Sequence, residues 1–217
     1  MREALNHVLV RDSLTALERA DELLAIATEH GMRLHVAAAT MFRGWALADE
    51  GRGQEGLAEM SRILPAVESF AATSWLYAHL ADSYRKNGRP EEGLTTVATG
   101  LRETERGGER AAEPELYKVE GELLLMRDPP DEAEAERCFH TAIDIARRQQ
   151  ARFFELRATT SLARLLKRQG KAGEARAMLA EIYNWFTEGF EFADLKDAKA
   201  LLEELGVPGG PAGASGE

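Results

Sequence analysis

The fold is decided by a pattern of small residues in the stretch GWALADEGRGQEG, residues 44–56. Gly51 interrupts a helix-favouring segment, because glycine readily adopts the left-handed conformation that ends helices. One small residue, Gly44, stands seven positions before this break, and another, Gly56, stands five positions after it. Small side chains at these positions let two helices joined by a tight turn approach closely. The stretch therefore predicts an antiparallel helix pair.

The same pattern recurs along the chain. Gly88 and Gly170 are flanked by small residues at the same two spacings, and a fourth copy fits if Pro129-Pro130 is a two-residue insertion in its turn. The second small residues of the four copies are spaced 37 to 42 residues apart, at Gly56, Gly93, Ala135 and Ala175. This period is typical of helical repeat arrays, in which each unit buries its apolar face against its neighbours.

Helix-forming residues at three- and four-residue spacings fill the segments between the glycine and proline breaks. We expect four helix pairs, over residues 33–69, 72–105, 113–149 and 152–187. An additional helix is expected at 12–30, a capping helix at 194–205 and a flexible tail at 206–217. The sequence thus predicts one all-α domain over residues 1–205, a right-handed solenoid with a concave face.

The small–turn–small pattern resembles the tetratricopeptide repeat. Leu80 and Leu162 occupy the apolar site just before the first small residue, whereas Arg43 and Glu120 stand there in the other two units. The resemblance implies a stack of antiparallel helix pairs that acts in protein interaction.

A narrower resemblance is carried by sequence blocks that stand in order along most of the chain. The blocks are RGWALA at 43–48, GELLL at 121–125, RRQQA at 147–151, ELRA at 155–158, YNWFTEGF at 183–190 and DLKDAK at 194–199. Together they are similar to the C-terminal repeat region of bacterial multidomain signalling proteins that join a class III adenylate/guanylate cyclase domain to an ATPase. The resemblance implies a regulatory module without catalysis of its own. The alternative is the sensor arm of an ATPase-coupled transcription regulator.

Composition limits the partners and the compartment. The formal net charge is −10 and the pI is near 5.1, which argues against nucleic-acid or anionic-membrane partners, because phosphate contacts need a basic face. The single cysteine, Cys138, excludes an intramolecular disulfide. No apolar run approaches the roughly 20 residues that a membrane span needs. We expect a cytoplasmic protein.

Motifs for chemistry are weak. Residues 51–56 spell G-x-G-x-x-G, but a dinucleotide site needs these glycines between a strand and a helix, and here they fit the repeat turn. Cys138 and His140 are two residues apart and face different sides of a helix. Acidic residues such as Asp131 and Asp194 stand at helix starts, where they cap free N–H groups. We expect no enzyme activity, cofactor or metal. The large aromatic residues are expected in the core or sealing an end: Trp45, Trp75, Trp185 and Phe186.

A basic stripe is the one surface feature that suggests a binding site. Arg157, Arg164 and Arg168 share one helix face at about 100° per residue, with Ser161 between them. Arg85 and Lys86 reach similar places in the second unit. By the repeat alignment all six residues line the concave groove, where they could bind an acidic peptide or an acidic protein domain. The alternative is an ordinary solvated face.

The first expected helix, 12–30, resembles the second helix of a pair. Its apolar arc includes Leu17 and Leu24 and is wider than packing on one side requires. We expect this surface to be covered, either by residues 3–10 folding back or by a second copy of the chain in a homodimer through Leu17 and Leu24.

Overall fold

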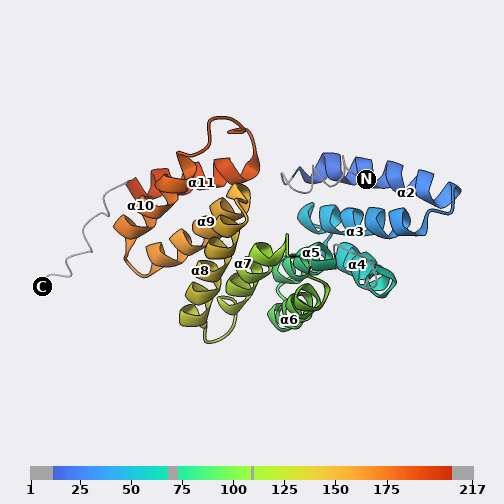
Figure 1. The fold of residues 1–217 in the computed structure, drawn as a ribbon, viewed down its shortest axis with the longest axis horizontal. Helices are drawn as coiled ribbons and strands as arrows, with labels where there is room; N and C mark the ends of the chain where they lie inside the picture. Colours follow the sequence, from blue (N-terminus) through green and yellow to red (C-terminus); the bar gives the residue numbers. More distant parts are fainter. Residues whose placement is uncertain (1–11, 68–72, 109, 207–217) are drawn as a thin grey trace, which may run out of the picture.

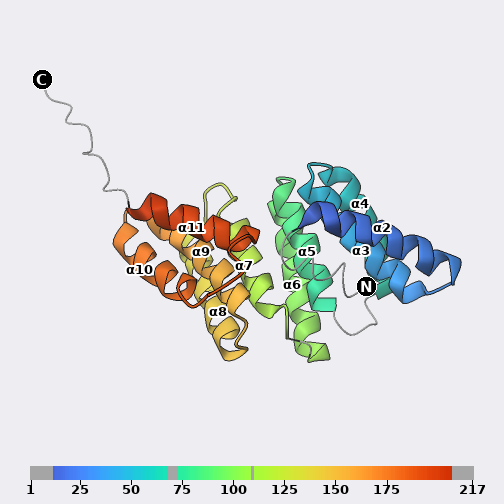
Figure 2. The same ribbon diagram turned by 90° about the horizontal axis from the view of Figure 1, so that it is seen from above.

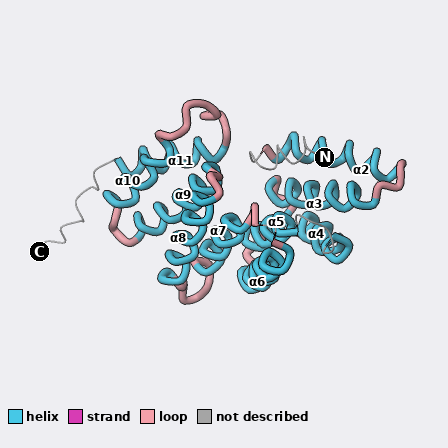
Figure 3. The backbone as a smooth tube through the Cα atoms, viewed as in Figure 1, coloured by secondary structure: helices cyan, strands magenta, loops and turns pink. Residues whose placement is uncertain are grey.

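Helices follow one another along the described part of the chain, residues 12–67, 73–108 and 110–206 of the computed structural model. They are α2 (Ser13–Glu29), α3 (Arg33–Asp49), α4 (Gly53–Val67), α5 (Thr73–Lys86), α6 (Pro90–Gly107), α7 (Glu113–Leu124), α8 (Glu132–Arg148), α9 (Arg152–Arg168), α10 (Ala172–Tyr183) and α11 (Ala193–Gly206). Within these ranges the chain forms no strand (Figure 3). The expected tail falls outside them, apart from Gly206.

The helices are arranged in pairs along an arc that runs from α2 to α11 (Figures 1 and 2). α3, α5, α7, α9 and α11 form an inner row, since each contacts the next one in the row. α4, α6, α8 and α10 pack outside this row against their partners. α2 packs against α3, in the place of the second helix of a preceding pair.

Close helix approach depends on the small residues that the sequence singles out. A Cβ atom added to Gly44 would lie 2.8 Å from the carbonyl oxygen of Gly56, and one added to Gly56 would lie 2.2 Å from the carbonyl oxygen of Gly44. Both distances are far below van der Waals contact, so α3 and α4 cross where only glycine fits. The turn glycines Gly51, Gly88 and Gly170 have φ values of +83°, +69° and +79°. Their predicted role is confirmed.

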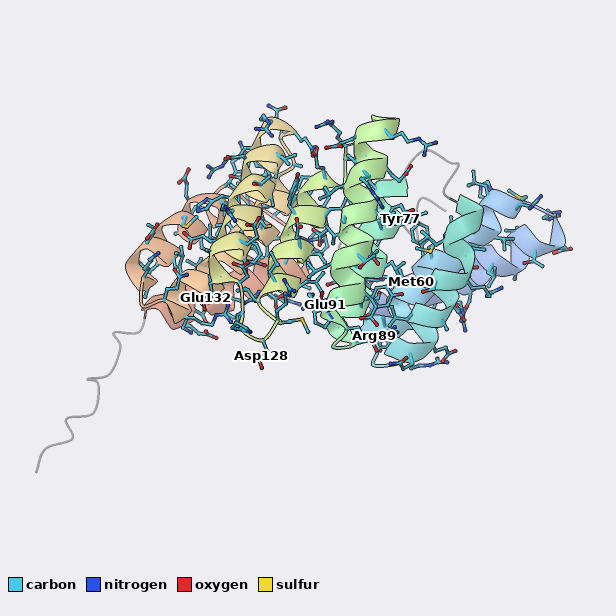
Figure 4. All side chains as sticks on the ribbon, turned by 90° about the horizontal axis from the view of Figure 1, so that it is seen from below. Met60, Tyr77, Arg89, Glu91, Asp128 and Glu132 are labelled. Atoms are coloured by element: carbon cyan, nitrogen blue, oxygen red, sulfur yellow. The ribbon has the colours of Figure 1, made fainter. Side chains whose placement is uncertain are left out.

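The turns between paired helices lie along one edge of the molecule, where Figure 4 labels Arg89, Glu91, Asp128 and Glu132. In the third pair the turn contains two prolines and no left-handed glycine. Asp131 begins α8 by accepting a hydrogen bond from the Glu134 N–H, 3.1 Å away, as its spacing predicts.

The apolar core continues through the array as three neighbouring clusters, which include Trp45, Tyr77 and Phe139. Cys138 lies in the last cluster and is buried. Burial raises the pKa of its thiol to about 12, which keeps the thiol protonated. The described helices include none that is long and apolar enough to cross a bilayer.

The C-terminal aromatic residues differ from the prediction. α10 ends at Tyr183, four residues earlier than expected, because the chain turns so that Phe186 packs against Phe153 with ring centroids 5.0 Å apart. Phe186 is buried, but Trp185 is 56% exposed. Of the two places expected for Trp185, the core or an end of the array, the core is therefore excluded. Its ring contacts the Arg152 guanidinium on the surface.

The outer face of α2 is partly apolar. Leu17 and Leu24 are half-buried, and Leu17 packs on the first core cluster. Leu14 and Ile26 are the exposed large apolar residues of this helix, at 64% and 54%. Residues 3–10, one of the two coverings predicted for this surface, lie outside the described residues, and the other, a second copy of the chain, stays a prediction.

Candidate functional site

The concave side of the array carries a groove with two adjoining cavities. The first, here called the floor cavity, has a volume of about 160 Å³ and is lined by residues of α3, α5, α7, α9 and α11. The second, here called the side cavity, has a volume of about 700 Å³ and lies between the C-terminal ends of α7 and α9 and the middle of α11. Side chains of successive repeat units thus meet in one continuous groove.

All six residues that the sequence predicts to line the concave groove, the basic stripe with Ser161, Arg85 and Lys86, do line it. Arg85, Lys86, Arg157, Ser161 and Arg164 line the floor cavity, and Arg168 lines the side cavity. The repeat alignment therefore placed these residues on the correct face. Their role in binding a partner stays a prediction.

Arg157 is occupied by carboxylates of the chain itself. Its Nη2 lies 2.7 Å from Asp194 Oδ2, and its Nη1 lies 3.7 Å from Glu115 Oε2. The side chain is only 11% exposed. Arg157 therefore serves to join α9 to α7 and α11, and it is not an open cation for a partner. Ser161 is likewise engaged, because its hydroxyl donates to Glu122 Oε1 at 2.7 Å.

The two basic residues of α5 are paired in the same way. Arg85 Nε lies 3.0 Å from Glu122 Oε2, and Lys86 Nζ lies 2.5 Å from Asp49 Oδ1. Asp82 pairs with both cations, at 2.8 Å and 3.1 Å. Burial alone would raise the pKa of Asp82, but Lys86, Arg85 and Lys118 outweigh it and hold this pKa well below its usual value. The floor of the groove is thus a network of alternating charges rather than a basic strip.

Several of these polar partners stand one repeat apart in the sequence. Lys86 follows Asp49 by 37 residues, and Asp194 follows Arg157 by 37 residues. Lys167 and Glu204 are also 37 residues apart, with 2.6 Å between Lys167 Nζ and Glu204 Oε2. Equivalent positions of consecutive inner helices therefore carry complementary charges, which tie one unit to the next.

The sequence interpretation missed the acidic half of this network. Asp194 stands in the first turn of its helix, as predicted, and it also faces Arg157, which the helix pattern alone does not reveal. The missed residues are Asp49, Asp82, Glu115 and Glu122. A comparison of groove positions one repeat apart would have paired opposite charges and found most of them.

Two arginines remain open to a partner. Arg164 and Arg168 are exposed, and neither has an ion-pair partner among residues 12–67, 73–108 and 110–206. They line the side cavity together with apolar side chains, of which Met126 is 41% exposed. The other apolar residues there are Leu125, Leu165, Ala200 and Leu201. The side cavity therefore combines an apolar wall with two unpaired cations, and its lining also includes Arg85, Lys167 and the carboxylates of Glu122, Asp197 and Glu204.

Aromatic rings cross the groove from α3 to α9. The His79 ring lies between Trp45 and Trp75, with centroid distances of 5.8 Å and 5.9 Å. Trp75 in turn lies 5.3 Å from Phe154 of α9. Burial lowers the pKa of His79 to about 4, so its imidazole is neutral at neutral pH. No sequence motif marked His79.

The described residues include no group of three or more His, Cys, Asp and Glu side chains that could hold a metal ion. The G-x-G-x-x-G stretch lies in the turn between α3 and α4 and extends into α4, which begins at Gly53. A helix precedes it instead of a strand, so these glycines form a repeat turn, as predicted.

Comparisons with known proteins support the fold. No protein-family model matches the sequence, and no curated protein matches it. Among solved structures, BtubC (BKLC) from P. vanneervenii superposes with a TM-score of 0.58 at 13% identity, covering 97% of this chain and 96% of its own. A putative kinesin light chain with TPR-like repeats from Podosopora anserina superposes with a TM-score of 0.56 at 13% identity, covering 77% of this chain and 84% of its own. A point variant of that protein superposes with a TM-score of 0.56 at 15% identity, covering 83% and 90%. The predicted all-α, tetratricopeptide-like repeat solenoid is confirmed.

Proposed function

We propose that this protein is a non-catalytic interaction module whose groove binds a peptide segment with acidic side chains and one large apolar side chain. The observation that carries the proposal is the side cavity, in which Arg164 and Arg168 are exposed beside Met126 and Leu125. Carboxylates of a peptide would form charge-assisted hydrogen bonds with the two guanidinium groups. An apolar side chain would bury its surface against the cavity wall.

The dimensions of the side cavity agree with this occupant. Its volume of about 700 Å³ lies within the range of roughly 300–1,000 Å³ for ligand sites. Arginine is suited to planar recognition of carboxylates, because its guanidinium presents parallel N–H donors. The network on the groove floor holds the inner helices together, so the cavity is formed before the peptide arrives and binding requires little reorganisation.

The wider context rests on the sequence blocks alone. By that resemblance we propose a cytoplasmic regulatory module of a cyclase–ATPase signalling protein. The alternative, a sensor arm of an ATPase-coupled transcription regulator, would use the same groove. Purified protein is expected to show no ATP hydrolysis and no cyclic-nucleotide synthesis.

Selection from a random peptide library displayed on phage tests the proposed specificity. At low salt, the wild-type protein should enrich peptides with two or more Asp or Glu residues near a Leu, Met, Phe or Trp. Arg164→Glu with Arg168→Glu should abolish this enrichment. Selection of basic peptides, or of the same acidic peptides by the variant, would contradict the proposal.

A further inference from the structure

The floor cavity contains three buried polar atoms that form no hydrogen bond. They are His79 Nε2, Glu115 Oε2 and Glu122 Oε2. Glu115 is only 9% exposed as a whole residue, so its free oxygen is well shielded from bulk water. Both carboxylate oxygens have ion-pair partners but no hydrogen bond: Arg157 Nη1 lies 3.7 Å from Glu115 Oε2, and Arg85 Nε and Lys118 Nζ lie 3.0 Å and 3.5 Å from Glu122 Oε2.

Unbonded atoms of this kind are costly, and most buried polar groups in folded proteins have a partner. The three unbonded atoms of the floor cavity come from two helices, α5 and α7. Two are carboxylate oxygens, which accept and do not donate. The neutral imidazole of His79 can accept through Nε2 as well, when its proton is on Nδ1. A group that satisfies all three must therefore be a multiple donor.

The charges around the cavity favour a cation. The described residues that line it carry five carboxylates and five lysine or arginine side chains. Arg164, one of the five, lines the side cavity as well and is open to the acidic partner there. When an acidic partner pairs with Arg164, four cations remain for the five carboxylates of the floor cavity, and one additional positive charge restores neutrality there.

We propose that the floor cavity binds a guanidinium group, supplied by an arginine side chain of the peptide that occupies the groove. This inference rests on the proposed function. The guanidinium has five N–H donors and no acceptor, which matches a site of three acceptors. The preferred partner segment therefore combines an arginine for the floor cavity with acidic and apolar side chains for the side cavity.

Nuclear magnetic resonance with small probes tests this site separately from the side cavity. The probe is N-acetyl-arginine amide, and its matched control is N-acetyl-citrulline amide, which has nearly the same shape and no charge. Trp45 lines the floor cavity, so its indole N–H signal should shift in a saturable way with the arginine probe. The indole signal of Trp185, which belongs to neither cavity, should not shift.

Single substitutions locate the site. Glu122→Gln should weaken binding of the arginine probe by about tenfold, since it removes a charged acceptor. His79→Phe should also weaken it while keeping an aromatic ring between Trp45 and Trp75. Glu203→Gln, an exposed position on α11 outside both cavities, should leave the affinity unchanged. Circular dichroism at each step establishes that the variants are folded.

The outcomes separate the two proposals. If N-acetyl-arginine amide leaves Trp45 unshifted while acidic peptides still bind, the floor cavity holds water only and this inference is wrong, whereas the proposed function stands. Equal binding of the citrulline control, or unchanged binding by Glu122→Gln, also overturns it. Agmatine, a small molecule with a guanidinium group, tests whether the guanidinium comes from a peptide. Tighter binding of agmatine than of N-acetyl-arginine amide would contradict the proposal that a peptide arginine supplies it.

Discussion

Arg157 of α9 and Asp194 of α11 form a buried ion pair, with 2.7 Å between Arg157 Nη2 and Asp194 Oδ2. Asp194 is 4% exposed, and Glu115 of α7 approaches the same guanidinium from the other side. One arginine thus connects three consecutive inner helices. This pairing changes the interpretation of the basic stripe, because its most deeply buried basic residue stabilises the array instead of meeting a partner.

Removal of this arginine should destabilise the fold. We expect Arg157→Met to lower the free energy of unfolding by about 3 kcal/mol, because it leaves buried carboxylates without their partner. Arg168→Met, on the same helix but exposed, should change it by less than about 0.5 kcal/mol. Urea denaturation followed by circular dichroism measures both. The double variant Arg157→Met with Asp194→Leu should recover part of the loss. Equal stabilities of Arg157→Met and Arg168→Met would show that the pair is not structural.

Gly44 should tolerate no added methyl group. Alanine favours helix over glycine by about 1 kcal/mol, but the new Cβ would lie 2.8 Å from the Gly56 carbonyl oxygen and 2.4 Å from Met60 Cγ. We expect Gly44→Ala to cost about 1–3 kcal/mol in unfolding free energy, as overpacking does. Gly173→Ala is the matched control, since a Cβ there meets nothing within 4 Å, and it should stabilise α10. A stabilised Gly44→Ala would refute the close crossing of α3 and α4.

Helices, turns and close-contact positions could be predicted from the sequence because they depend on local signals. Glycine breaks and three- to four-residue apolar spacing placed the start of α3 at Arg33 and that of α6 at Pro90. The end of α10 could not be predicted in this way, since it is determined by the packing of Phe186 on Phe153, residues far apart in sequence.

The groove was only half predictable for a related reason. The face that carries Arg157 and Arg164 follows from helical periodicity on one helix. The different environments of the two arginines do not follow from periodicity. Arg157 is paired because α7 and α11 bring Glu115 and Asp194 to it, whereas Arg164 is exposed. Burial of His79 between two tryptophans likewise depends on how neighbouring helices pack.

His79 should make the fold sensitive to mild acid. Its pKa is about 4 in the folded protein, mainly through burial, against a usual value of 6.5. Glu115 and Asp82 raise this pKa, and Arg157 and Lys86 lower it. Because the unfolded chain takes up the proton first, the stabilisation is complete above pH 6.5 and is lost as the pH falls towards 4.

Urea denaturation between about pH 7.5 and pH 4 measures this effect. The unfolding free energy of the wild type should fall across the window, and His79→Phe should reduce the slope. His140→Gln, an exposed position, should behave like the wild type. Glu115, with a pKa of about 2, loses its contribution only at lower pH, between about 4.5 and 2. Equal slopes for wild type and His79→Phe would contradict the assignment.

Self-association through α2 remains a prediction. Leu17 packs on the core, so Leu17→Glu would disturb the fold as well as any interface. The exposed residues Leu14 and Ile26 give a cleaner test. If a second copy covers this face, sedimentation velocity should show dimers at micromolar concentration, and Leu14→Glu with Ile26→Glu should return monomers. A wild-type protein that is monomeric at every concentration would exclude the homodimer.

The affinity of a selected acidic peptide is the most direct test of whether the groove binds its partner through Arg164 and Arg168. The peptide most enriched by the wild-type protein is labelled and titrated by fluorescence anisotropy at two salt concentrations. Arg164→Glu with Arg168→Glu should raise its Kd at least about tenfold and flatten the salt dependence. Arg62→Glu with Arg106→Glu makes the same change of net charge on α4 and α6, and should shift Kd only slightly. If both double variants weaken peptide binding equally, or if Arg164→Glu with Arg168→Glu leaves the affinity unchanged, the groove does not bind the peptide through these two arginines.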